Sequence, residues 1–346
     1  MKRLMEYCSA NYIRLQLKKC AVMCVNGDEE DQQPIEIDDL LLNQTKCEVY
    51  LGSGITNSTK LIDDVNADIK NRQISVVKFY AFLRTNHNAP VDVKLKVNDA
   101  CILTSILYNS ETWANANITR LEVVYRRMLR SIIGVGSSTC NEILYIELGV
   151  PSIKTKVMMK QFEFWRKVRE MDEENPIKYI IREAKRFKLK EVEHYEQLLE
   201  KFDNKEQIRD QFFEETRNAI RQKAREGRSK YVTYMQINND LTTPTCYDNI
   251  KHSFVAMIGK LRTSTHSLHI EMGRRSGTAR ERRFCHCGLG VEDEKHFLLD
   301  CEVYRDIRRK HGVDVGLEEV LGDNKFVPYN AELMEKRRSV RQAQSD

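Results

Sequence analysis

Apolar residues recur at steps of three and four along most of this chain, and few residues interrupt that spacing. Leu121, Tyr125, Met128 and Ile132 form one such series, which predicts an amphipathic helix closed by Gly134. Only 6 of the 346 residues are proline and 15 are glycine, whereas 31% are charged. This composition is typical of long helices with charged surfaces, so we expect a mainly α fold with a small α+β part.

The first sixty residues depart from the helical spacing. We expect one helix and three short strands there, over residues 4–14, 20–25, 35–37 and 47–51. Two further helices are expected beyond them, an amphipathic one over 62–83 and a buried one over 94–108.

Changes in pattern divide the chain into five expected parts. They are a mixed segment, a compact helical unit, a helical connector, a basic helix with a small metal-binding module, and a charged tail, over residues 1–60, 61–150, 151–240, 246–312 and 313–346. No apolar run reaches the roughly 18 residues that a membrane span needs, and residues 1–14 lack a signal-peptide core. We therefore expect an intracellular protein, in the cytoplasm or nucleus, with no membrane partner.

Three of the ten cysteines lie close together with a histidine between them. Cys285, Cys287, His296 and Cys301 supply three thiolates and one imidazole, the donors that Zn²⁺ prefers in a tetrahedral site. Because four protein ligands leave no position for water, we expect a structural zinc ion whose binding stabilises a short loop. Two alternatives are that these residues merely pack in a small core, or that His286 replaces one ligand.

The spacing of these ligands makes two demands on the backbone. Two ligands one residue apart need a tight turn, which Gly288 and Gly290 permit. His296 and Cys301 are five positions apart and would point roughly 140° apart on a regular helix. The helix between them is therefore expected to break or loosen.

A basic segment directly precedes the Cys/His cluster. Between residues 259 and 283, seven cations face only two glutamates; they are Lys260, Arg262, Arg274, Arg275, Arg280, Arg282 and Arg283. Guanidinium groups hold phosphate oxygens bidentately, so we expect this segment to bind the backbone of RNA or single-stranded DNA. His266, His269 and Phe284 are expected to stack on bases. The alternative is a solvated loop beside an ordinary zinc site.

Four stretches appear in an order that is familiar from one protein family. Residues 7–23 and 50–55, then 96–113 with 126–134, then 261–304 with the Cys/His set, resemble the C-terminal part of a reverse transcriptase from a non-long-terminal-repeat retrotransposon. The resemblance covers 1–150 and 250–310 and implies the end of a palm with its primer grip, a helical thumb and a zinc knuckle. Gln16 and Asn109 depart from the family, which usually has Asn and Gly there.

The resemblance also implies which catalytic groups to look for. Polymerisation in that family uses carboxylates from its first and third palm motifs to hold two metal ions. Both motifs precede the fourth, which lies at the start of this sequence. Asp38 and Asp39 are out of order for that role, and Lys18 or Lys19, which match the family's pyrophosphate-linked lysine, transfer no nucleotide without metals. We expect no polymerase activity from this chain.

Three hypotheses follow from these patterns. The first is a truncated, non-catalytic retroelement-derived protein that binds RNA or single-stranded DNA through its basic segment and zinc knuckle. The second is an incomplete gene model of an active RNA-directed DNA polymerase. The third is a host-recruited adaptor whose knuckle recognises another protein.

Overall fold

The chain is mainly helical, with 63% of residues in helices and 5% in strands, which confirms the expected fold class. The computed structural model describes residues 2–14, 16, 20–28, 30, 31, 33–37 and 40–343. Lys18, Lys19, Asp38 and Asp39 lie outside the described residues. None of the helices in the described part combines the length and the apolar character needed to cross a bilayer.

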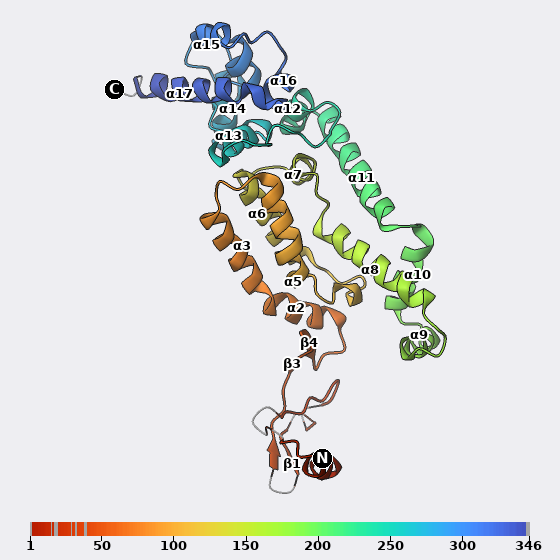
Figure 1. The fold of residues 1–346 in the computed structure, drawn as a ribbon. Coiled ribbons are helices and arrows are strands. Elements are labelled where there is room, and N and C mark those ends of the chain that lie inside the picture. The colour runs from red at the N-terminus through yellow and green to blue at the C-terminus, as the bar shows by residue number, and fades with distance from the viewer. Residues whose placement is uncertain are drawn as a thin grey trace.

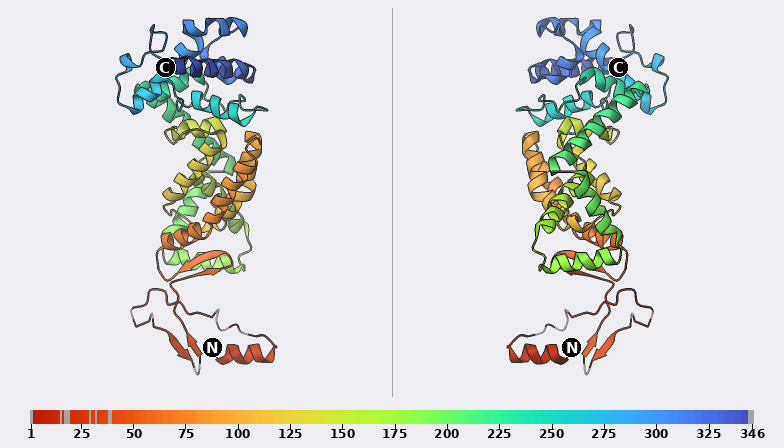
Figure 2. Two further views of the ribbon diagram at one scale, coloured as in Figure 1. Left: turned by 90° about the vertical axis from the view of Figure 1, so that its left-hand side faces the viewer. Right: turned by 90° about the vertical axis from the view of Figure 1, so that its right-hand side faces the viewer.

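The molecule is elongated, with an N-terminal segment, a helical middle and a C-terminal helical unit following one another (Figures 1 and 2). The N-terminal segment contains one helix and two antiparallel hairpins: α1 (Lys2–Ala10), β1 (Ile35–Ile37), β2 (Leu40–Leu42), β3 (Cys47–Tyr50) and β4 (Ser53–Thr56). The strand expected over 20–25 is reduced to one bridge between Val22 and Gln44. Its residues stay exposed or half-buried because neither hairpin extends to cover them.

The helical middle begins with the elements expected to form a compact unit. They are α2 (Leu61–Asn71), α3 (Gln73–Thr85), α4 (Val91–Val97), the π-helical η2 (Asn98–Leu103), α5 (Thr104–Ile106), the 3₁₀ turn η3 (Ser110–Thr112), α6 (Thr119–Ile133) and α7 (Asn141–Leu148). Helix α6 ends where expected, because Gly134 takes the left-handed conformation with φ of +65°. Asn109 also has a positive φ, +61°, in a region that asparagine tolerates better than most residues.

The single helix expected over 62–83 is broken at Arg72. Its guanidinium donates hydrogen bonds to the carbonyl oxygens of Gly52 and Tyr108, at 2.7 and 2.5 Å, and to the carboxylate of Asp68 at 3.1 Å. The same carboxylate accepts the backbone N–H of Gly54 at 2.7 Å. The periodicity does not reveal this break, since it depends on contacts with the β3–β4 hairpin.

The connector consists of five helices that lead to the C-terminal unit (Figure 1). They are α8 (Ile153–Glu170), α9 (Pro176–Arg186), α10 (Lys190–Lys201), α11 (Lys205–Arg225) and α12 (Ser229–Ile237). Trp165 of α8 stacks on Tyr195 of α10 with their ring centroids 4.1 Å apart. The apolar stripes of these helices therefore pack helix on helix, as their spacing predicts.

The C-terminal unit contains helices and single turns around the Cys/His cluster. They are α13 (His252–Arg262), α14 (His269–Arg275), η4 (Arg280–Arg282), the π-helical η5 (His296–Asp300), η6 (Glu302–Tyr304), α15 (Arg305–Lys310), α16 (Leu317–Gly322), η7 (Asn324–Phe326) and α17 (Val327–Ala343). The range 313–346 is not a charged tail in its described part. Val320, Leu321, Tyr329 and Leu333 are buried in the same apolar cluster as Cys285, because apolar residues recur at helical spacing among the charges.

A buried ion pair joins the helical middle to the C-terminal unit. Arg262 of α13 donates two hydrogen bonds of 2.8 Å to the carboxylate of Glu147 on α7, and both side chains are almost fully buried. Tyr234 and Tyr247 donate to the same carboxylate, and Arg262 also donates to the carbonyl of Leu321 on α16. Burial and then the charge of Glu147 raise the pKa of both tyrosines, so their hydroxyls stay protonated donors.

We expect the substitution Arg262→Met to lower the free energy of unfolding by about 3–5 kcal/mol, because it leaves the Glu147 carboxylate buried without its cation. Adding Glu147→Gln should recover more than half of that loss, since the neutral amide accepts one tyrosine hydroxyl with its oxygen and donates its N–H to the oxygen of the other. Urea unfolding followed by circular dichroism measures both variants. A double variant less stable than Arg262→Met alone would contradict the role given to this ion pair.

Candidate metal centre

Cys285, Cys287, His296 and Cys301 lie together in the C-terminal unit. Their ligand atoms are all within 4.8 Å of one another, which is close enough to hold one metal ion. The Sγ atoms of Cys285 and Cys301 are 3.7 Å apart, and Cys287 Sγ lies 3.3 Å from His296 Nε2. The structure thus brings together the four predicted ligands, drawn from positions sixteen residues apart.

The first two ligands lie on a tight turn. The backbone N–H of Gly288 donates to the carbonyl of Cys285 at 3.0 Å, and that of Cys285 donates to the carbonyl of Gly290 at 2.7 Å. Gly288 has φ of +74°, which confirms its predicted role. At Gly290 φ is not positive and an added Cβ would make only ordinary contacts with the His296 ring, so this glycine is not required.

The other two ligands flank the loosened helical turn that their spacing predicts. His296 begins the π-helical turn η5, and the N–H of Cys301 donates to the carbonyl of His296 at 2.8 Å. This wider turn brings the two side chains to one side. Phe297 and Leu298, inside the turn, are buried in the main apolar cluster, and Tyr329 of α17 donates to the carbonyl of Leu298.

Two buried glutamates anchor the loop between the ligand pairs. Glu292 accepts hydrogen bonds from Arg337 of α17 at 2.6 and 2.7 Å, and Glu294 accepts from His266 and from the Ser264 hydroxyl, both at 2.9 Å. Burial raises the pKa of each carboxyl, but Arg337 and His266 respectively outweigh it, so both pKa values lie below the usual range. Both glutamates are therefore charged at neutral pH.

These anchoring residues were missed in the sequence. Glu292 and Glu294 are two residues apart and lie between the candidate ligands Cys287 and His296. In an extended segment this spacing places two side chains on the same side, which is only a weak signal. Arg337 lies in a charged run that is typical of a solvated helix face, and nothing local distinguishes it from its neighbours.

The predicted nucleic-acid-binding residues have different environments. The prediction for Arg262 is wrong, because this side chain is 1% exposed and bound to Glu147. It lies one turn after the buried Ile258, on the inner face of α13. Arg274 pairs with Glu271 and Arg280 with Asp293.

The remaining four predicted cations pair with no carboxylate among the described residues. Arg283 donates to the carbonyls of Ile270 and Thr278, and Arg275 donates to the carbonyl of Thr265 at 3.4 Å. Lys260 and Arg282 are exposed, and within the described part of the chain no carboxylate pairs with either.

The three residues expected to stack on bases also have different environments. His266 is 4% exposed and bound to Glu294, so its predicted stacking is wrong. His269 is half-buried, with Nδ1 2.6 Å from the carbonyl of Phe284. The Phe284 ring is 55% exposed, which leaves it the one of the three with an open face.

His286 belongs to a second group of potential ligands instead of the first. It lies with His269 and Glu292, whose ligand atoms are within 4.8 Å of one another. The carboxylate of Glu292 is already held by Arg337 and by the backbone N–H of His269 at 2.7 Å. The structure therefore favours Cys285, Cys287, His296 and Cys301 as the metal ligands.

Burial changes the acidity of two thiols of the cluster. It raises the pKa of Cys285 well above its usual value and raises the pKa of Cys301 as well. Metals bind thiolates, so binding here must release protons. Affinity for a metal ion is accordingly expected to increase with pH.

Comparison with known proteins gives no relative from which to transfer a function. The chain matches no protein-family model, no curated protein and no solved structure at a significant level.

We expect the folded protein to bind one Co²⁺ with a thiolate-to-metal charge-transfer absorption, and Cys287→Ser to weaken that binding by removing one thiolate. The matched control is Cys101→Ser, since Cys101 is exposed on η2, far along the chain from the cluster. Titrations at several pH values should show the association constant rising about tenfold per pH unit for each proton released. Folded protein without this absorption, or an unchanged band in Cys287→Ser, would contradict the assignment.

Proposed function

We propose that this chain binds RNA or single-stranded DNA through its C-terminal unit, residues 246–343, and that a structural zinc ion holds that unit together. The observation that carries the proposal is the four-ligand cluster in the same unit as two exposed cations, Lys260 and Arg282, with which no carboxylate of the described chain pairs. We further propose that the chain is related to the reverse transcriptases of non-long-terminal-repeat retrotransposons.

The choice of zinc rests on donor chemistry and spacing. Thiolate sulfurs about 2.3 Å from a tetrahedral zinc ion are about 3.8 Å apart, close to the 3.7 Å between Cys285 and Cys301. Four protein ligands complete the coordination, so the ion serves structure and not catalysis. Because the ligands bracket a short loop, metal binding would contribute directly to the folding of this unit.

The cations that remain unpaired among the described residues favour nucleic acid as the ligand of this unit. Arg262, Arg274 and Arg280 are held by carboxylates, whereas Lys260 and Arg282 are exposed and have no such partner in the part of the chain that the structure describes. Positive charges with no internal counterion attract phosphate groups and release counterions when they bind them. Contacts of this kind hold a backbone without reading its sequence.

The proposed relationship has one piece of structural support. The stretches 50–55 and 107–113, which resemble the primer grip and part of the thumb, lie against each other. Arg72 bonds to Gly52 in the first stretch and to Tyr108 in the second, and the Tyr108 hydroxyl donates to the carbonyl of Leu51 at 3.1 Å.

We expect zinc-loaded protein to bind a fluorescently labelled single-stranded oligonucleotide with an affinity that falls steeply between about 50 and 200 mM NaCl. Replacing Lys260, Arg275 and Arg282 together by glutamine should reduce the slope of log K against log salt by about 2, or about 0.7 per lost phosphate contact. Fluorescence anisotropy measures both quantities.

The matched control replaces three exposed lysines of the connector by glutamine. They are Lys167 on α8, Lys188 between α9 and α10, and Lys190 on α10. This variant loses the same charge and should keep the wild-type slope. Absence of binding at low salt, or equal losses in the two triple variants, would reject the proposal. Zinc-loaded protein that binds no nucleic acid would instead favour the protein-interaction adaptor.

A further inference from the structure

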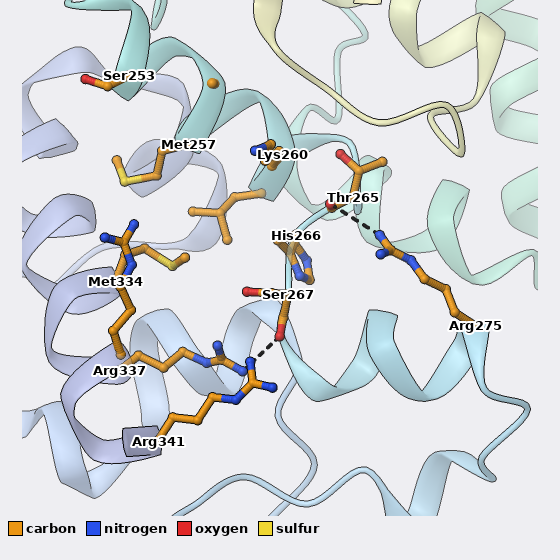
Figure 3. Close-up of a pocket in the computed structure, with 13 residues that line it drawn as sticks. Ser253, Met257, Lys260, Thr265, His266, Ser267, Arg275, Met334, Arg337 and Arg341 are labelled. Atoms are coloured by element: carbon orange, nitrogen blue, oxygen red, sulfur yellow. Dashed lines mark hydrogen bonds between the residues drawn. The ribbon is translucent and has the colours of Figure 1, made fainter. Parts of the chain in front are cut away.

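A basic cavity lies between α13 and α17 and is closed on one side by the loop 263–268 (Figure 3). Its volume is about 370 Å³, within the range of roughly 300–1,000 Å³ in which ligand pockets fall. Met257 of α13 and Met334 of α17 supply apolar wall. The cavity lies in the same unit as the Cys/His cluster, and α17, which forms one of its walls, falls within residues 313–346, which were expected to be a charged tail.

Cations from three helices converge on this cavity. They are Lys260 of α13, Arg275 of α14, and Arg337, Arg338 and Arg341 of α17, and among the described residues no aspartate or glutamate lines the wall. Met334, Arg337, Arg338 and Arg341 follow the spacing i, i+3, i+4, i+7, which places them on one face of α17. Like charges brought together repel one another, so such a grouping favours occupation by an anion.

Some cations of the cavity are held by other protein groups, whereas others are available to bind a ligand. Arg337 is 3% exposed and bound to Glu292 and to the carbonyl of Ser267 at 2.9 Å, so it forms part of the floor. Lys260 and Arg338 are exposed, and no carboxylate in the described part of the chain pairs with either. These two side chains can turn toward a ligand without breaking an ion pair.

The wall is suited to a ligand that is both anionic and partly apolar. Arginine binds phosphate oxygens bidentately, and lysine adds a point charge. Methionine packs against irregular apolar surfaces such as a sugar or a base face. A nucleotide unit within a strand combines these features, whereas inorganic phosphate would use only the cations.

We propose that this cavity holds a backbone phosphate of a single-stranded nucleic acid, with Lys260 and Arg338 as its ligands. This inference rests on the proposed function and adds to it the place of binding and one ligand, Arg338, outside the basic segment 259–283. The docked helix α17 thereby acts as part of the nucleic-acid-binding surface.

The test uses zinc-loaded full-length protein and a labelled single-stranded oligonucleotide, with Arg338→Gln compared against Lys336→Gln. Lys336 is exposed on the same helix, does not line the cavity and loses the same charge. We expect Arg338→Gln to reduce the salt slope by about 0.7 and the affinity about fivefold at 0.1 M salt, and Lys336→Gln to change neither. If the two substitutions have equal effects, or if neither has an effect, the cavity assignment is overturned. In that case the proposed function still stands as long as the wild-type protein binds the strand.

Two further outcomes are distinguished in the same assay. If the wild-type protein binds no strand, the proposed function fails and the cavity assignment fails with it. If inorganic pyrophosphate displaces the strand from the wild type as effectively as unlabelled oligonucleotide does, the cavity is a site for a free anion and the strand assignment is overturned. Weak competition by pyrophosphate that is itself lost in Arg338→Gln supports the assignment.

Discussion

The carboxylate of Glu147 organises the junction between the helical middle and the C-terminal unit. Four hydrogen bonds reach it, from Arg262, Tyr234 and Tyr247, which come from separate segments of the chain. A charge buried this deeply is tolerated only when its partners are fixed in place, so the interaction sets the position of α13. Helix α13 in turn forms one wall of the basic cavity and contacts α17.

The metal cluster depends on the same arrangement. Its loop is held to α17 by Glu292 and Arg337, to the 263–268 loop by Glu294 and His266, and to the core by Phe297. The ligands are thus positioned partly by the surrounding helices and partly by the turn geometry at Gly288 and η5. We interpret metal binding and the docking of α17 as two contributions to one folded unit, with the cations of α17 oriented as a result.

Features encoded by neighbouring residues could be predicted from the sequence. The four metal ligands lie within one short stretch, and the loosened turn between His296 and Cys301 followed from their spacing alone. Features that depend on distant partners could not. Arg262 has the sequence context of a surface cation, but its partner lies 115 residues earlier. The break at Arg72 likewise depends on Gly52 and Tyr108, and the docking of α17 on a core formed by other helices.

One apolar cluster includes both Val65 on α2 and Leu333 on α17. A segment cut at 246–312 would keep all four metal ligands but lose Tyr329, Leu333 and Arg337, which cover and anchor them. Such a fragment, transplanted into another protein, would carry exposed apolar surface and a buried glutamate without its cation. In this chain the four-ligand loop therefore does not form a self-sufficient module, and a fragment meant to keep its fold must include α16 and α17.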